Sequence, residues 1–216
     1  MGGKDETPDS HKRVQWVYEA TSRQDLQARY DRWAKDYDAD LSDDFGYLAP
    51  QMAVAKTAPL LSDDPLVLDA GVGTGLVGEA LKAAGVARIV GIDMSAGMLE
   101  AARAKGVYQE LRQAVLGEPL PFADDAFDAT LCIGTLTLGH APAESLEELV
   151  RVTKPGGPVS FTLMTSIYES HGFKARQEAL EAAGRWRLVE AARRQHILPK
   201  GEPELEHDLW IYQVLA

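Results

Sequence analysis

The stretch from Val67 to Leu76, VLDAGVGTGL, constrains the fold more than any other part of the chain. A short apolar run ends at Asp69, three glycines follow at alternate positions, and a helix-forming segment begins. Glycine permits a tight turn between strand and helix and lets a ligand approach the backbone closely. Open α/β sheets bind ligands at this carboxyl edge of their strands. The stretch therefore predicts a strand, a loop and a helix that together hold a ligand.

A second acidic residue indicates what kind of ligand this is. Asp93 ends the next apolar run, 20 residues after Gly73. A carboxylate at that place can accept hydrogen bonds from both ribose hydroxyls of an adenosine. The run from Gly73 to Gly78 also fits the G-x-G-x-x-G pattern of dinucleotide-binding proteins. The local pattern thus predicts an adenosine cofactor and leaves NAD(P) open.

Apolar runs alternate with helical segments along most of the chain. Strands are predicted at 66–69, 89–93, 107–112, 128–134 and 159–164, and helices at 74–84, 96–105, 143–153 and 173–183. This order predicts an α/β fold with a doubly wound, mostly parallel sheet that helices cover on both faces. Two final runs, 187–197 and 208–215, are expected to pair antiparallel at the sheet edge.

The N-terminal segment has a different pattern. Residues 1–13 are polar and are predicted to be flexible. Residues 14–37 predict a helix with one face formed by Leu26, Tyr30, Trp33 and Tyr37. Five aspartates between positions 36 and 44 predict a solvated helix end. We expect a single domain over 14–216, with a helical cap at 14–60 and a Rossmann-like core at 61–216.

Composition excludes several kinds of partner. With 22 basic and 33 acidic residues the net charge is −11, which argues against binding to nucleic acid or to an anionic membrane surface. No apolar run approaches a membrane span or a signal core, so a cytoplasmic protein is expected. The lone Cys132, expected to be buried and inert, and the spacing of the histidines predict no metal site.

Several ordered segments resemble the class I S-adenosylmethionine-dependent methyltransferases. They are residues 30–38, the glycine loop at 69–75, and the segments 93–99, 120–128 and 151–157. Residues 30–34, 75–77 and 116–121 look most similar to the Williams–Beuren critical-region methyltransferase group. The resemblance implies a seven-stranded sheet with its last strand antiparallel, and S-adenosyl-L-methionine as the cofactor.

The resemblance also implies which residues bind that cofactor. They are Tyr30, Trp33, Asp69, Gly71, Gly73, Gly75, Asp93, Met94, Met98, Leu116, Thr135 and Leu136. The amides of the three glycines and the Asp69 carboxylate are expected to face the methionine part, Asp93 the ribose and Met94 the adenine. Tyr30 and Trp33 are candidate lids, or else members of the helix's core stripe. Leu116 stands where the family often has an acid, so adenine recognition is expected from the backbone of Val115 or Leu116.

The expected reaction is transfer of a methyl group to a small-molecule acceptor. His140 follows the fourth predicted strand, and its imidazole titrates near neutrality, so it is the candidate general base or else a structural histidine. Ser166, Tyr168 and His171 follow the fifth strand and are candidate substrate contacts or plain loop residues. Two alternatives remain at this point: an NAD(P)-dependent oxidoreductase and a non-catalytic S-adenosylmethionine-binding protein.

Overall fold

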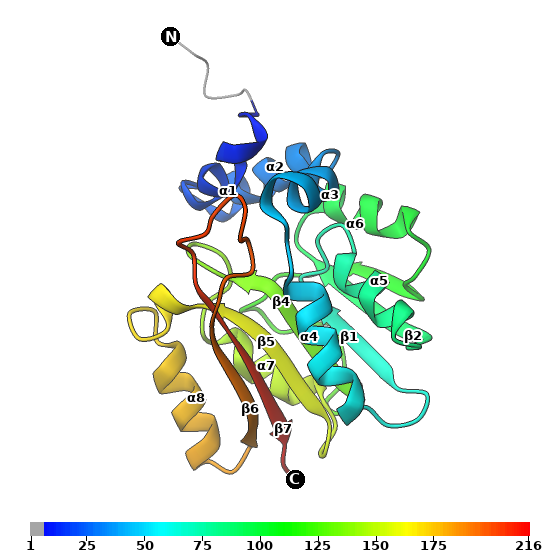
Figure 1. The fold of residues 1–216 in the computed structure, drawn as a ribbon. Coiled ribbons are helices and arrows are strands. Elements are labelled where there is room, and N and C mark those ends of the chain that lie inside the picture. Colours follow the sequence, from blue (N-terminus) through cyan, green and yellow to red (C-terminus); the bar gives the residue numbers. More distant parts are fainter. Residues whose placement is uncertain (1–6) are drawn as a thin grey trace.

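Seven strands form one sheet in the order β3-β2-β1-β4-β5-β7-β6 (Figure 1). The computed structural model describes residues 7–216. The strands are β1 (Leu66–Ala70), β2 (Arg88–Asp93), β3 (Glu110–Gln113), β4 (Ala129–Leu136), β5 (Pro158–Met164), β6 (Trp186–Gln195) and β7 (His207–Val214). The pairs within β3-β2-β1-β4-β5 are parallel, whereas β7 runs antiparallel to both β5 and β6. The predicted fold class and the antiparallel last strand are confirmed.

Helices cover both faces of this sheet. They are α4 (Ala49–Thr57), α5 (Leu76–Ala83), α6 (Ala96–Ala104), α7 (Ser145–Val152) and α8 (Phe173–Ala182), with short 3-10 turns η2 (Ala58–Leu60) and η3 (Thr165–Ile167). Alternate residues of a strand point to opposite faces. Accordingly Val67 joins the apolar core that contains Leu81 of α5, and Leu68 joins the core that contains Leu149 of α7.

A cap of short helices lies over one end of the sheet (Figure 1). It consists of α1 (Ser10–Tyr18), α2 (Arg23–Trp33), α3 (Tyr37–Ala39) and a π-helical turn, η1 (Asp40–Phe45). The expected cap boundary at residue 60 is wrong, because α4 packs on α5, β4 and β5 as part of the sheet layer. The cap therefore ends before α4 begins.

The start of the cap also differs from the prediction. Residues 1–6 of the expected flexible segment lie outside the described residues, but α1 already begins at Ser10. The Arg13 guanidinium lies 2.6 Å from Asp40 and 3.0 Å from Asp36, which holds this helix on the cap. The expected single helix over 14–37 is two helices, because the Ser22 side chain caps α2 by accepting from the Asp25 amide.

One of the five cap aspartates is not solvated as predicted. Asp40 is buried, and its Oδ2 accepts from the Trp33 indole at 2.6 Å as well as from Arg13. A buried carboxylate with a cation and an N–H donor is stable where an unpaired one is not. The acidic run in the sequence does not reveal that Asp40 is buried, because its partners Arg13 and Trp33 lie on α1 and α2.

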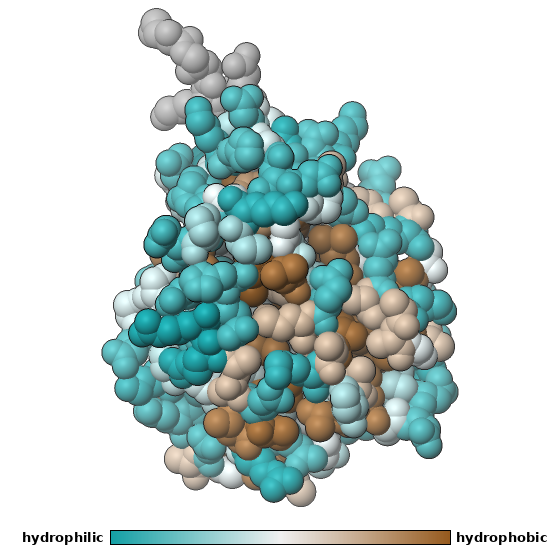
Figure 2. Space-filling view, in the orientation of Figure 1, coloured by the Kyte–Doolittle hydropathy of each residue, from teal (hydrophilic) through white to brown (hydrophobic). Residues whose placement is uncertain are grey.

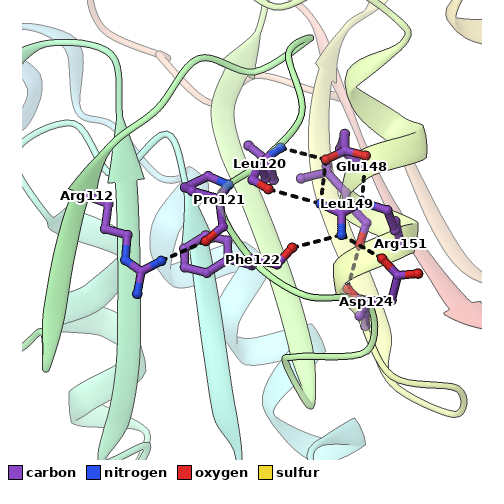
Figure 3. A network of polar contacts seen from close by, with 9 residues as sticks. Arg112, Leu120, Pro121, Phe122, Asp124, Glu148, Leu149 and Arg151 are labelled. Carbon is purple, nitrogen blue, oxygen red and sulfur yellow. Dashed lines mark hydrogen bonds and ion pairs between the residues drawn. The ribbon is translucent and has the colours of Figure 1, made fainter.

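The segment Leu120–Asp124, which carries the Leu-Pro-Phe motif, is held by a network of charged groups (Figure 3). Arg151 of α7 donates to the carbonyls of Leu120 at 3.1 Å and Phe122 at 2.9 Å, and to the Asp124 carboxylate at 2.7 Å. Glu148 accepts from Arg151 at 2.7 Å and from the Leu120 amide at 2.6 Å. The motif is therefore a structural clamp between α7 and the approach to β4.

The surface shows the same division between cap and sheet. In Figure 2 the cap is mostly hydrophilic, whereas apolar side chains gather over the lower part of the same face. In the described part of the chain, no helix combines the length and apolarity that a membrane crossing needs.

Candidate functional site

A cleft lies between the carboxyl edge of the sheet and the cap. Its sheet wall comes from the loop after β1, the end of β2 and the end of β4, and its cap wall comes from α2, α3 and the segment after η1. Nine of the predicted site residues line it: Tyr30, Gly71, Gly73, Asp93, Met94, Met98, Leu116, Thr135 and His140. The structure thus brings most of the predicted set to one place.

Asp93 is fixed in this wall by two backbone amides. Its Oδ2 accepts from the Gly73 amide at 2.9 Å, and its Oδ1 accepts from the Ser95 amide at 2.9 Å. Burial raises the pKa of Asp93, and these two amides oppose that rise by stabilising the carboxylate. Each carboxylate oxygen keeps acceptor capacity for a ligand.

The glycine loop folds back on β2. Gly71 has φ +87°, and a Cβ there would lie 2.3 Å from Thr135 Oγ1, so the loop and β4 approach as closely as glycine allows. The amides of the three glycines, which are expected to face the methionine part of the cofactor, all have partners in the structure. They donate within the protein, Gly71 to the Ile92 carbonyl at 2.8 Å, Gly73 to Asp93, and Gly75 to the Val72 carbonyl at 2.8 Å. The glycines therefore allow the loop to approach β4 closely, and their amides are already used within the protein.

Asp69 and Gly75 do not line the cleft. Asp69 is fully buried, and its Oδ2 accepts from the Tyr108 hydroxyl at 2.7 Å while its Oδ1 has no partner among the described residues. Burial raises the pKa of Asp69 to about 7. The Tyr108 ring also lies against Gly75, where an added Cβ would be 3.1 Å from it. Tyr108 therefore contacts both residues, and it does not line the cleft either.

Trp33 and Leu136 are also outside the cleft wall. The Trp33 indole donates to the buried Asp40, so this ring belongs to the core of the cap, as the alternative interpretation held. Leu136 is fully buried and pairs with Leu163 after a register shift in β4. That irregularity turns the Leu136 side chain into the sheet core.

Tyrosines form the cap wall of the cleft. Tyr30, Tyr37 and Tyr47 line it, and the Tyr47 hydroxyl lies so close to Gly134 that a Cβ there would be 2.2 Å away. Burial raises the pKa of all three hydroxyls, so they are neutral. The sequence placed Tyr37 on the face of Tyr30 without assigning it to the site. It carries no local signal for Tyr47.

His140 is held by hydrogen bonds on both ring nitrogens. Its Nδ1 lies 2.8 Å from the Leu138 carbonyl and 3.0 Å from Thr137 Oγ1. A carbonyl only accepts, so we assign the ring proton to Nδ1. The Tyr30 hydroxyl, 2.7 Å from Nε2, then donates to it. Burial lowers the pKa of His140, so its imidazole is neutral at pH 7.

The three candidate substrate contacts after β5 do not line the cleft. Ser166 and His171 are exposed, and Tyr168 stacks on Trp210 at 5.5 Å between ring centroids. They belong to the surface and to the packing around β7. Cys132 is buried in β4 as predicted, and burial raises the pKa of its thiol to about 12.

Comparison with known proteins decides the family. Residues 68–185, more than half of the chain, match the family described as a methyltransferase domain. The chain belongs to this family. Human Methyltransferase-like protein 27, the Williams–Beuren region methyltransferase, is 43% identical over 164 residues, which are 73% of this chain and 66% of that protein. Both levels of the resemblance seen in the sequence are confirmed.

Other relatives share shorter stretches. The demethylmenaquinone methyltransferase of Clavibacter sepedonicus is 40% identical over 95 residues, 43% of this chain and 38% of that protein. The ubiquinone biosynthesis O-methyltransferase of Alkalilimnicola ehrlichii is 33% identical over 111 residues, 50% of this chain and 44% of that protein. The methyltransferase chain thus matches just under two thirds of the human relative's length and under half of these two.

Solved structures share the fold. The [4+2]-cyclase SpnF superposes with a TM-score of 0.69 at 17% identity, covering 91% of this chain and 97% of its own. A SAM-dependent methyltransferase of Thermotoga maritima superposes with a TM-score of 0.57 at 20% identity, covering 87% of this chain and 98% of its own. Family membership makes S-adenosylmethionine the cofactor, and the alternative of an NAD(P)-dependent oxidoreductase is wrong.

Proposed function

We propose that this methyltransferase transfers a methyl group to a small-molecule acceptor, with His140 as the general base. The observation that carries the proposal is the opposition of two unlike walls across one cleft. Asp93 and the glycine loop lie on the sheet side, and Tyr30 of the cap lies on the other, bonded to His140 of the segment after β4. A small molecule fits between such walls, whereas a polymer needs an open groove.

The residues of the sheet wall suit S-adenosylmethionine. Asp93 has acceptor capacity left on both oxygens, as a ribose diol requires. Met94, Met98 and Leu116 supply apolar surface for a flat base. Leu116 offers no side-chain acceptor, so the adenine amino group is assigned to the backbone of the segment 114–116, which lines the cleft.

When bound, S-adenosylmethionine supplies a methyl group on a positively charged sulfur, which passes to an acceptor lone pair while the carbon–sulfur electrons stay on sulfur. The chain has to exclude water and, for a hydroxyl acceptor, remove a proton. The Tyr30 hydroxyl donates its hydrogen bond to Nε2 of His140, so the lone pairs of its oxygen stay available. As the Tyr30 proton passes to His140, this oxygen takes the proton of the acceptor's hydroxyl. The proton balance then ends with a neutral Tyr30 and a protonated His140.

The names of two relatives support a small acceptor. They are a demethylmenaquinone methyltransferase and a ubiquinone biosynthesis O-methyltransferase. The cyclase SpnF shares the fold at 17% identity, so the fold by itself does not fix the reaction. The proposal therefore depends on the groups in the cleft.

Calorimetric titration followed by turnover tests this proposal. We expect micromolar binding of S-adenosylmethionine and S-adenosylhomocysteine and no binding of NAD or NADP. Formation of S-adenosylhomocysteine with a panel of small hydroxyl, amine and carboxylate acceptors then identifies the reaction. Binding without turnover across the panel favours a non-catalytic binding protein, and binding of NAD instead contradicts the cofactor assignment.

A further inference from the structure

One face of α2 lines the cleft with three side chains of different chemistry. Arg23, Leu26 and Tyr30 stand at positions i, i+3 and i+7 of this helix, and all three line the cleft. Side chains at such spacings share one face of a helix, and seven residues span about 10 Å along its axis. The face therefore presents a cation at one end, an aliphatic side chain in between, and at the other end the hydroxyl that is bonded to His140.

The segment after β4 forms the wall opposite this face. Gly139, Ala141 and Pro142 line the cleft beside His140 and bring no charged group to it. Pro142 packs against Gly117, where an added Cβ would lie 2.6 Å from its ring. This wall thus leads from the proposed base to the loop after β3. The residues assigned above to the ribose and the adenine belong to the sheet wall, so the strip between α2 and the segment 139–142 is left for the acceptor.

Arg23 brings a positive charge to the far end of this strip. Among the described residues that line the cleft it is the only lysine or arginine. Its guanidinium is paired with the carboxylate of Glu118, and the two side chains are 57% and 54% exposed. Exposed ion pairs contribute little to stability, so another carboxylate can replace Glu118 at small cost. The parallel N–H donors of a guanidinium match the two oxygens of a carboxylate.

We propose that Arg23 binds a carboxylate of the methyl acceptor, so that the acceptor is a hydroxy acid with an apolar body. This rests on the proposed function of the cleft. The acceptor's hydroxyl lies at Tyr30 and His140, its body lies along Leu26, and its carboxylate takes the place of Glu118 on Arg23. An amine at that end would meet a like charge, and an uncharged end would forgo the charge-assisted hydrogen bonds.

The first test uses two probes that differ only in charge at one end. The protein is first titrated with S-adenosylhomocysteine, which reads the proposed function. The loaded protein is then titrated with 4-hydroxycinnamate and with its uncharged amide. We expect the acid to bind at least tenfold more tightly than the amide. Equal affinities overturn the proposal, and so does binding of S-adenosylhomocysteine with neither probe. Failure of S-adenosylhomocysteine itself overturns the cofactor site instead.

A matched pair of variants on α2 then locates the carboxylate. Arg23→Gln should weaken binding of 4-hydroxycinnamate at least fivefold and leave the affinities for the amide and for S-adenosylhomocysteine unchanged. Arg32 lies over the Trp16 ring at 5.2 Å and does not line the cleft, so Arg32→Gln is the control. An equal loss in the two variants contradicts the assignment. A loss of S-adenosylhomocysteine affinity as large as that of the acid would assign Arg23 to the cofactor and overturn the proposal.

Glu118 provides a test with the opposite sign. Glu118→Gln removes the charge that competes for Arg23, so 4-hydroxycinnamate should bind at least twofold more tightly to this variant than to the wild type. Both side chains of the pair are more than half exposed, so the fold should tolerate either change. Unchanged or weaker binding of the acid by Glu118→Gln would mean that the two carboxylates do not share Arg23, which overturns the proposal.

Discussion

The two walls of the cleft differ in how their polar groups are used. On the sheet side, both oxygens of Asp93 and the amides of Gly71, Gly73 and Gly75 already have partners within the protein. On the cap side, the hydroxyls of Tyr37 and Tyr47 have none among the described residues. The sheet wall is therefore preorganised by its own backbone, whereas the cap wall leaves hydrogen-bonding capacity to a ligand.

The cap is joined to the sheet layer by carboxylates. Asp31 of α2 accepts from the Ser95 hydroxyl and from the Gly97 amide, the latter at 2.9 Å. Asp38 accepts from the Thr74 hydroxyl and lies 2.8 Å from the Lys105 ammonium. These contacts set the position of the tyrosines relative to Asp93, and each wall can be perturbed separately.

The largest effect is expected from the proposed base, His140, in the segment after β4. His140→Gln should lower kcat by about 10²-fold or more, a typical contribution of a general base, without changing S-adenosylhomocysteine affinity. Because burial lowers the pKa of His140, the wild-type rate should stay high as pH falls below about 6.5 and decline only at lower pH. Initial rates from pH 4.5 to 8 measure the loss of kcat in the variant and the pH dependence of the wild type. A variant as active as the wild type assigns His140 a structural role.

On the sheet side, two glycine substitutions distinguish the stability cost of a positive φ from the cost of a close contact. Gly71 and Gly85 have similar φ values, +87° and +91°, but an added Cβ meets Thr135 at Gly71 and nothing within 4 Å at Gly85. Gly71→Ala should lower the free energy of unfolding by about 3 kcal/mol, and Gly85→Ala by about 1 kcal/mol. Urea denaturation measures both. Equal losses would show that the approach of Gly71 to β4 is unimportant.

His207, buried at the start of β7, should make stability depend on pH. Between pH 6.5 and about 4 the unfolded chain protonates residue 207 and the folded chain does not, so the free energy of unfolding falls as pH falls. From pH 7.5 to pH 5 the wild type should lose about 2 kcal/mol more than His207→Phe. Denaturation at the two pH values measures the difference, and parallel pH dependences would mean that His207 is solvated.

The smallest effect is expected from loosening the cap. Asp31→Ala removes the bonds to Ser95 and Gly97 and should cost about 1 kcal/mol. Hydrogen exchange should speed up in α2 and stay unchanged in β1 and β4. Asp43→Ala, which removes an exposed carboxylate of the cap, is the control. Uniform acceleration in all elements would mean that the cap and the sheet unfold together.

The sequence predicted the sheet wall far better than the cap wall. The loop after β1 and Asp93 lie within one βαβ unit, so their spacing encodes their proximity. The pattern showed that glycines were needed, but not that the amides of Gly71 and Gly73 would donate to β2. It also could not show the hydrogen bond from the Tyr108 hydroxyl to Asp69.

The cap wall depends on contacts between distant segments. Tyr47 comes to the cleft through its approach to Gly134, and His207 of the last strand lines a small cavity together with Tyr47. Asp40 looked like one of several solvated acids because its partners, Trp33 and Arg13, lie on other helices. Such contacts are set by tertiary packing, which local periodicity does not encode.

The central claim is that the sheet wall holds the cofactor and the cap wall faces the acceptor. Calorimetric titration of S-adenosylhomocysteine into the wild type, Asp93→Ala and Tyr37→Phe tests it most directly. Asp93→Ala should weaken binding more than ~10-fold, since lost charge-assisted hydrogen bonds cost on the order of 1.5–3 kcal/mol, and Tyr37→Phe should change it less than about twofold. Unchanged affinity in a folded Asp93→Ala variant, or an equal loss in Tyr37→Phe, would contradict the account.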